Sequence, residues 1–290
     1  MEPSAFAQQA PEKNERSIDS QTKKGAEFRA LHHRDDAFIL PNPWDIGTAR
    51  LLAHLGFEAL ATTSAGFAAS VGLRDYAVTR DEMIAHVAVI AAATPLPVSA
   101  DLQNGFGDSP EAAAETIRLA AEAGVVGGSI EDSTGNADQP IYEFEHAVER
   151  VRAACDAARA LSFPFTLTAR CENHLNGKPD LADTIARLQA YQEAGADVLY
   201  APGLVRREDI AEVVRSLDRP VNVLAGIPGL AVNRAELAAL GVKRISIGSG
   251  LSRAALSAFL RAAREMREHG TFTFAEGTLS LREIGAMFPE

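Results

Sequence analysis

Eight short apolar segments recur along the chain, and amphipathic stretches rich in alanine separate them. One apolar segment and the stretch after it occupy about 25 to 30 residues. Short apolar segments that alternate with helices are typical of strands buried on both faces of a parallel sheet. The segments lie at residues 37–40, 58–63, 97–100, 127–130, 165–169, 197–201, 221–225 and 244–248.

The stretches between these segments predict helices, some with recognisable ends. Ser109 and Pro110 supply a capping residue and a first-turn proline, and Gly124 ends the same stretch. Eight strand–helix units in about 250 residues predict a (β/α)8 barrel of the TIM type, with a doubly wound open sheet as the alternative. Helices are expected near residues 46–55, 80–93, 110–123, 143–161, 180–194, 206–216, 233–240 and 251–269.

Composition narrows the class of protein. A chain of 290 residues with 47% hydrophobic and 23% charged residues has enough apolar material for a sizeable core. Residues 1–26 are polar and lack periodicity, so we expect a flexible extension there and a single barrel domain with a helical tail over 27–290.

The net charge and the length of the apolar runs argue against nucleic acids and membranes as partners. The formal net charge of −11 argues against nucleic-acid binding. No apolar run is long enough to cross a bilayer and the N-terminus lacks a secretory pattern, so we expect a cytoplasmic protein without a membrane partner. Two cysteines, Cys155 and Cys171, cannot form a disulfide framework or a zinc cluster.

Polar side chains follow the apolar segments, where barrel enzymes carry their active sites. In PVSADLQNGFG, residues 97–107, the apolar run ends in Asp101 and Gln103. Other segments lead into Asn42 and Asp45, Ser64–Gly66, Asp75, Glu131 and Asp132, and Arg170, Glu172 and Asn173.

This composition suits a cation of the Mg²⁺ type, which prefers carboxylate oxygens and water. The guanidinium of Arg170 can bind a carboxylate with two hydrogen bonds, and the backbone N–H groups of the Ser64–Gly66 turn can receive a second anionic oxygen. Together these residues predict a site for a small 2-oxo or 2-hydroxy acid whose enolate is stabilised. Asp45 is interpreted instead as the N-cap of the first barrel helix.

Six stretches resemble the isocitrate lyase and phosphoenolpyruvate mutase superfamily, in the same order and with similar spacing over about residues 27–270. They are LPNPWDIGTARLL, ATTSAGFAASVGLRD, SADLQNGFG, GGSIEDS, LTARCEN and AGADVLYAPG. The resemblance implies a Mg²⁺-dependent barrel, with Mn²⁺ as a substitute, that handles oxaloacetate- or pyruvate-like enolates. It also implies a homo-oligomer, a dimer or a tetramer, in which subunits exchange the last barrel helix.

The resemblance also implies roles for individual residues. Asp101 matches the metal-binding aspartate, and Arg170 matches the arginine that binds the substrate carboxylate. Glu131 and Asp75 match acids that act near the metal, directly or through water. Gln103 stands where the mutases have a second acid, and it is expected to supply an oxygen ligand to the metal or to orient a metal-bound water. Thr63, Ser64, Ala65 and Gly66 match the backbone cradle that binds the substrate oxyanion.

Departures from the family pattern restrict the activity. The loop at 133–142 contains neither the Cys nor the His of the Lys-Arg/Lys-Cys-Gly-His motif of isocitrate and methylisocitrate lyases. The histidine of the mutases falls on Pro202, and that of the oxaloacetate decarboxylases falls near Ser249 and Gly250. The chain is therefore interpreted as a lyase of the family that is not a true isocitrate lyase.

The predicted reaction is Mg²⁺-dependent cleavage or formation of a C–C bond in a small 2-hydroxy or 2-oxo dicarboxylate, with the 133–142 loop closing over the site. Two alternatives stay open: a phosphonate-active mutase or hydrolase that breaks a C–P bond, and a metabolite-binding barrel with impaired catalysis. Cys171 is interpreted as structural, because neighbouring side chains at a strand end point in opposite directions. Tyr200 and His174 are further candidates near the site.

Overall fold

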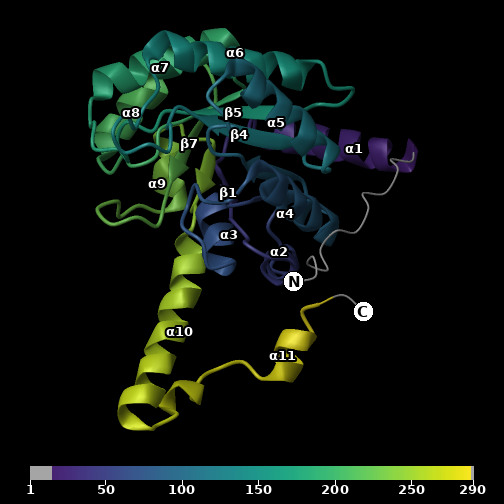
Figure 1. The fold of residues 1–290 in the computed structure, drawn as a ribbon, viewed down its shortest axis with the longest axis vertical. Coiled ribbons are helices and arrows are strands. Elements are labelled where there is room, and N and C mark those ends of the chain that lie inside the picture. Colours follow the sequence, from purple (N-terminus) through teal and green to yellow (C-terminus); the bar gives the residue numbers. More distant parts are fainter. Residues whose placement is uncertain (1–14, 289–290) are drawn as a thin grey trace.

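The computed structural model describes residues 15–288 and contains eight parallel strands in the order β1-β8-β7-β6-β5-β4-β3-β2. The two ends of this order approach each other, because the Ala61 N–H donates to the Pro41 carbonyl over 3.0 Å. The sheet is therefore a nearly closed barrel, which confirms the predicted (β/α)8 fold over the open sheet (Figure 1). The strands are β1 (Phe38–Leu40), β2 (Leu60–Ala61), β3 (Val98–Asp101), β4 (Gly127–Glu131), β5 (Thr166–Arg170), β6 (Val198–Tyr200), β7 (Val221–Leu224) and β8 (Arg244–Ser246).

The helices surround the barrel close to where the sequence predicts them. Asp45 caps α2 in a capping box with Thr48, as expected, and Ser109 caps α5 ahead of Pro110. No helix among residues 15–288 is long and apolar enough to span a bilayer. The helices are α1 (Glu15–Leu31), α2 (Ile46–His54), α3 (Ser64–Ser70), α4 (Arg80–Ala93), α5 (Pro110–Glu122), α6 (Phe144–Arg159), α7 (Leu181–Ala194), α8 (Arg207–Arg215), α9 (Arg234–Ala239), α10 (Gly250–His269), η1 (Thr273–Ala275) and α11 (Leu281–Gly285).

Helix α1 begins earlier in the chain than the sequence analysis expected ordered structure to begin. Part of the segment predicted as a flexible extension, residues 15–26, is helical and packs across the N-terminal ends of the strands. Gln21 donates to the carbonyls of Ala121 and Val125 over 2.8 and 2.9 Å, and Phe28 is fully buried. The sequence does not predict this helix because most of its residues are polar and only a few of them pack against the barrel. Residues 1–14 of the predicted extension lie outside the described residues.

Strand pleating divides the side chains into two sets. Because successive side chains alternate, Ile245 and Leu167 face the helices, whereas Arg244, Ser246 and Arg170 face the barrel interior and line a cavity there. The interior of this barrel is thus polar over several strands. Branched apolar residues dominate most TIM-barrel interiors.

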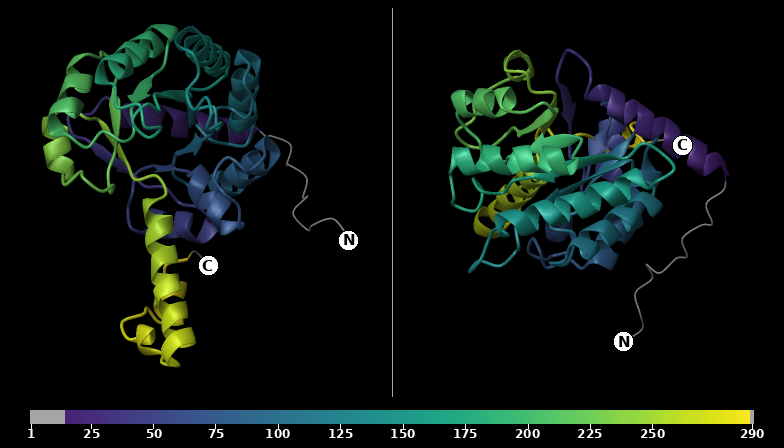
Figure 2. Two further views of the ribbon diagram at one scale, coloured as in Figure 1. Left: turned by 60° about the vertical axis from the view of Figure 1, so that its left-hand side comes forward. Right: turned by 90° about the horizontal axis from the view of Figure 1, so that it is seen from above.

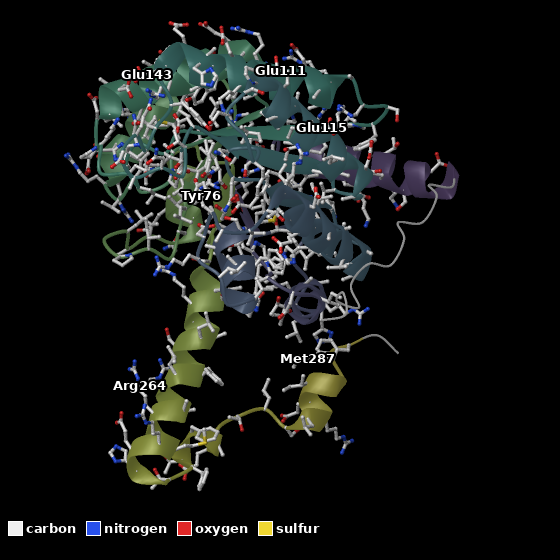
Figure 3. The ribbon with its side chains drawn as sticks, in the orientation of Figure 1. Tyr76, Glu111, Glu115, Glu143, Arg264 and Met287 are labelled. Atoms are coloured by element: carbon white, nitrogen blue, oxygen red, sulfur yellow. The ribbon has the colours of Figure 1, made fainter. Side chains whose placement is uncertain are left out.

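Helix α10 leaves the barrel instead of packing beside β8 and β1 (Figures 1 and 2). Arg264, labelled on this helix in Figure 3, lies well away from the barrel. Ile39, in the middle of β1, keeps 37% of its surface exposed, although it occupies a strand position that a helix normally covers. The helix carries its own exposed apolar side chains, Leu256, Phe259 and Leu260.

Candidate active site

Arg170, the last residue of β5, lies at the centre of a carboxylate cluster at the C-terminal ends of the strands. Its Nη1 is 3.0 Å from Asp101 Oδ1, and its Nη2 is 2.9 Å from Glu131 Oε2 and 2.7 Å from Glu172 Oε1. Asp101 and Glu131 end β3 and β4, so three neighbouring parallel strands deliver these groups to one place. The structure thus brings together three residues that the sequence analysis assigned to the site.

Burial controls the protonation of this cluster. It raises the pKa of Glu131 to about 8, against the opposing effect of Arg170. Burial likewise raises the pKa of Glu172. Burial alone would lower the pKa of Arg170, but Glu131, Glu172 and Asp101 raise it well above its ordinary value. The cluster therefore holds a permanent cation beside Glu131 and Glu172, two carboxyl groups that resist ionisation without further positive charge.

The predicted Ser64–Gly66 turn is the first turn of α3. Thr63 is its N-cap and accepts a hydrogen bond from the Gly66 N–H over 3.2 Å, and the Ser64 N–H donates to Asp101 Oδ2 over 3.0 Å. Ala65 and Ser64 line the same cavity as Arg170. Two of the three backbone N–H groups predicted to bind substrate are thus already bonded within the protein.

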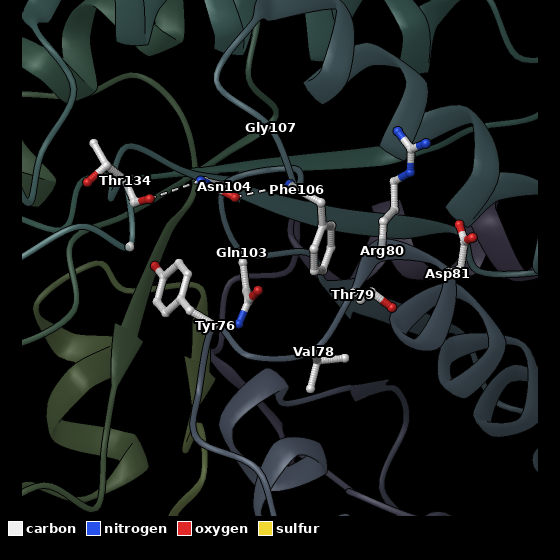
Figure 4. A pocket seen from close by; sticks show the side chains of 11 residues that line it. Tyr76, Val78, Thr79, Arg80, Asp81, Gln103, Asn104, Phe106, Gly107 and Thr134 are labelled. Atoms are coloured by element: carbon white, nitrogen blue, oxygen red, sulfur yellow. Dashed lines mark hydrogen bonds between the residues drawn. The ribbon is translucent and has the colours of Figure 1, made fainter.

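Gln103 and Asp75 form a wall beside the cluster. Gln103 Nε2 donates to Asp75 Oδ1 over 2.8 Å, and the Tyr76 hydroxyl bonds to Glu131. Burial, followed by Asp101, raises the pKa of Asp75. Gln103 thereby directs its N–H groups, which cannot bind a metal, toward Asp75. A larger cavity of about 580 Å³ lies beyond this wall, lined by Tyr76, Gln103 and Phe106 (Figure 4).

A smaller cavity of about 210 Å³ opens along the barrel axis above the interior side chains. Asp75, Asp101 and Arg170 line it, and no histidine or cysteine does so among the residues described. Pro202 and Ser249 also line it, so the two positions where relatives carry histidines face the cavity without an imidazole. Several further lining residues were not predicted from the sequence, among them Asn222, Arg244 and Ser246, and the role of Tyr200 was left open.

The remaining nucleophile and acid–base candidates lie away from the cavity. Cys171 is fully buried and burial raises the pKa of its thiol well above the usual value, which agrees with a structural role. Cys155 is buried in α6. His174 does not line the cavity, and burial lowers the pKa of its imidazole.

The 133–142 loop is pinned at its base and lies over the wall. Ser133 and Ile141 form an antiparallel bridge, and the Thr134 N–H donates to Pro140 over 2.9 Å. A side chain at Gly135 would collide with the ring of Tyr76. The loop therefore sits beside Tyr76, within reach of the cluster; its closure stays a prediction.

Asp132, next to Glu131 in the sequence, holds the cluster in place through buried hydrogen bonds. Its carboxylate accepts from the Glu172 N–H over 2.7 Å and from the Tyr191 hydroxyl over 2.6 Å, and Arg187 lies 3.3 Å away. All these contacts are buried. The two adjacent acids thus take different partners: Glu131 contacts Arg170, and Asp132 holds the backbone of Glu172 in place, as strand alternation requires.

Comparison with known proteins identifies the family. Residues 28–267 match the family described as phosphoenolpyruvate phosphomutase. An oxaloacetate decarboxylase of Paraburkholderia xenovorans is 30% identical over 272 residues, covering 91% of this chain and 86% of the relative. A Burkholderia cenocepacia crystal structure, described provisionally as a lyase or mutase, is 62% identical with a TM-score of 0.91 and covers 94% of this chain and 98% of its own.

A further solved structure, 2,3-dimethylmalate lyase, is 26% identical with a TM-score of 0.80, covering 92% of this chain and 94% of its own. Its description places it in the PEP mutase/isocitrate lyase superfamily. The chain belongs to this superfamily, and it is an enzyme of the carbon–carbon lyase type.

The donor set at the cluster can be compared with the needs of a divalent cation. Its oxygens are carboxylates, the ligands that Mg²⁺ prefers. Among residues 15–288, however, no group of three or more His, Cys, Asp or Glu side chains is arranged to hold a metal, because the acids turn toward Arg170. The set fits a cation that one or two carboxylates hold directly and that reaches the other acids through water.

Glu131 predicts a pH dependence of stability in the presence of a chelator. The folded protein keeps this proton up to about pH 8, whereas the unfolded chain releases it near 4.5, so the free energy of unfolding should fall as pH rises between these values. Each pKa unit corresponds to about 1.4 kcal/mol. In Glu131→Gln the fall, measured by urea denaturation from pH 5 to 8, should be smaller.

The control is Glu58→Gln at an exposed position, which should keep the wild-type slope. Equal slopes in wild type and Glu131→Gln would show that Glu131 ionises normally in the folded protein.

Proposed function

We propose that this enzyme is a Mg²⁺-dependent lyase that cleaves or forms a C–C bond in a small 2-hydroxy or 2-oxo dicarboxylate through an enolate of the pyruvate or oxaloacetate type. The observation that carries the proposal is the convergence of Asp101 and Glu131 on Arg170, beside a small cavity that Asp101, Arg170 and Ser64 line. Its volume of about 210 Å³ is below the roughly 300 to 1,000 Å³ of drug-sized ligand sites. A small organic acid fits this volume.

The side chains have distinct tasks in such a reaction. Asp101 and Glu131 would hold the Mg²⁺ or Mn²⁺ ion, which supplies positive charge where the enolate forms. Arg170 would bind the substrate carboxylate with the guanidinium donors that Asp101 and Glu131 occupy in this structure. The N–H of Ser64, released by Asp101 in the same way, adds a hydrogen bond to the developing oxyanion.

The relatives support the class of substrate. The matched oxaloacetate decarboxylase and 2,3-dimethylmalate lyase carry names that refer to small dicarboxylic acids. Neither the cysteine of the isocitrate lyase loop nor an imidazole lines the cavity among the described residues, so proton transfer must differ from that of isocitrate lyases. A cytoplasmic location stays a prediction.

The family description itself supports a second candidate, a phosphonate-active mutase or hydrolase. Both reactions place an enolate against the same cation and arginine, and they differ in the bond that breaks. A substrate screen separates them: phosphate release from phosphonopyruvate would indicate C–P chemistry, whereas formation of a 2-oxo acid from a dicarboxylate without phosphate indicates the lyase. Binding without any turnover would indicate the metabolite-binding alternative.

Replacement of Asp101 tests the proposal. Asp101→Ala should lower turnover of the substrate found in the screen by about a hundredfold or more. The reason is that the cation that stabilises the developing enolate charge would lose a carboxylate ligand. The variant should still fold, with wild-type far-UV circular dichroism. The measurement is the rate of 2-oxo acid formation with Mg²⁺.

Asp45→Ala is the matched control. This exposed aspartate caps α2 outside the cavity, so its loss should cost about 1 kcal/mol of stability and leave turnover unchanged. Undiminished turnover in Asp101→Ala would refute the assigned role.

We further propose that the protein is a homo-oligomer in which α10 packs against the barrel of another copy. The exposed side chains of Leu256, Phe259 and Leu260 lie on neighbouring turns of α10, and Ile39 is uncovered on the barrel. An apolar helix face that leaves its own barrel and an open barrel face are complementary surfaces.

Phe259→Asp should therefore reduce the molecular mass in solution to that of a single chain, because a charge would be buried in the interface. Size-exclusion chromatography with light scattering measures this mass. Lys23→Asp, at an exposed position of α1, should leave the mass unchanged. A wild-type protein that is already monomeric would contradict the proposal.

A further inference from the structure

Arg244 is the first residue of β8 and lies inside the barrel, with only 4% of its surface exposed. Its Nε donates to Asn222 Oδ1 over 2.9 Å. Asn222 in turn donates to Ser246 Oγ over 2.9 Å, and that hydroxyl lies 3.5 Å from the Tyr200 hydroxyl. A polar chain thus runs from Arg244 to Tyr200, whose ring lies 5.3 Å from the Arg170 guanidinium.

The guanidinium of Arg244 is incompletely bonded. Its Nη1 is buried and has no hydrogen-bond partner. Within residues 15–288, no carboxylate lies at ion-pair distance from it, whereas Arg170 in the same cavity has three. The two arginines therefore differ in kind: Arg170 is neutralised by the protein, and Arg244 is not.

An unpaired buried charge is costly, and proteins pair such charges or bind a counter-ion. Burial, with a further contribution from Arg170, lowers the pKa of Arg244 only to about 10, so the side chain is a cation at neutral pH. The polar and charged groups around it include Asn222, Tyr200, Arg170 and His32, none of which is an anion at that pH. The missing negative charge must come from outside the chain.

Arg244 lines the 210 Å³ cavity together with Asp101, Arg170 and Ser64. A ligand held at the carboxylate cluster therefore shares one continuous space with Arg244. Other lining residues at this end, Asn222 and Ser246, carry polar groups that can orient an anionic oxygen.

We propose that Arg244, with Asn222 and Ser246, forms a second anion-binding subsite that takes the distal carboxylate or phosphonyl group of the substrate. The substrate is then a dianion at least, with its reacting end at Asp101 and its far end directed into the barrel. This assignment rests on the proposed function for the position of the reacting end. It makes Arg244 a specificity-determining residue that selects diacids over monoacids.

Matched ligands test the subsite. Malate and 2-hydroxybutyrate differ only by a terminal carboxylate in place of a methyl group, and 2-hydroxyglutarate and 2-hydroxyvalerate form a longer pair. 2-Hydroxy-3-phosphonopropionate carries a phosphonyl group instead. Isothermal titration calorimetry with Mg²⁺ should show the wild type binding at least one dianion about 10- to 100-fold more tightly than its monoanionic partner, the range of a charge-assisted hydrogen bond.

Arg244→Met should remove this preference and leave the affinity for oxalate, whose two carboxylates are directly bonded and which carries no distal anionic group, unchanged. Arg244→Gln, which can still bond to Asn222, is the second variant should the first fail to fold. Arg80→Met is the control, because Arg80 Nε is also buried without a partner but lines the separate 580 Å³ cavity; it should keep the wild-type preference.

The outcomes separate the subsite from the proposed function. Equal binding of dianions and monoanions by the wild type, or a preference that survives in both Arg244 variants, would overturn the subsite, even if oxalate binds with Mg²⁺. A dianion preference that persists in chelator and disappears with Arg244 would support the subsite, even if oxalate shows no Mg²⁺ dependence. The relative affinity for the carboxyl and phosphonyl ligands identifies the terminal group.

Discussion

The ion pairs of Arg170 hold the site together. Its guanidinium contacts Asp101 at the end of β3, Glu131 at the end of β4 and Glu172 two residues beyond the end of β5. Without the arginine, three carboxyl groups would share one buried space, which like-charge repulsion and desolvation oppose. With it, the acids are close together and become available when another cation arrives. The same interaction thus explains both the stability of the cluster and its suitability for a metal.

The support beneath this cluster is also polar and buried. Asp132 receives hydrogen bonds from Tyr191 and from the backbone of Glu172, and Arg187 balances its charge. Networks of this kind are stable only when each member is satisfied. Arg244 differs from Arg170 in the same cavity, since one of its buried nitrogens has no partner and no carboxylate of the described residues pairs with it. A buried cation without a carboxylate partner, in the same cavity as the Arg170 cluster, can accept an anionic ligand.

Much of the fold could be predicted from the sequence because its signals are local. Strand periodicity, the cap at Asp45 and the proline at position 110 depend on neighbouring residues, and the structure agrees with each. The first helix escaped prediction because its packing depends on a few buried contacts, such as that of Phe28, within a polar segment.

The site could be predicted in part. The positions of Asp101 and Arg170 follow from the strand ends, but the direction of the Gln103 amide depends on Asp75 across a loop. Arg244 was missed because it stands at the start of its strand, where the sequence analysis did not look. Strand alternation in RISIG, which places a charged residue on the inner face of the barrel, was the signal that could have revealed it.

Thermal unfolding of the wild-type protein with Mg²⁺, with oxalate, with both and with a chelator tests the central claim most directly, because oxalate mimics a small enolate. A ligand at about a hundred times its dissociation constant adds about 2.7 kcal/mol of stability, which corresponds to several degrees in the unfolding midpoint. The account predicts that oxalate raises the midpoint only when Mg²⁺ is present. An unchanged midpoint under all four conditions, or an equal rise in chelator, would contradict a metal–enolate site at Asp101 and Arg170.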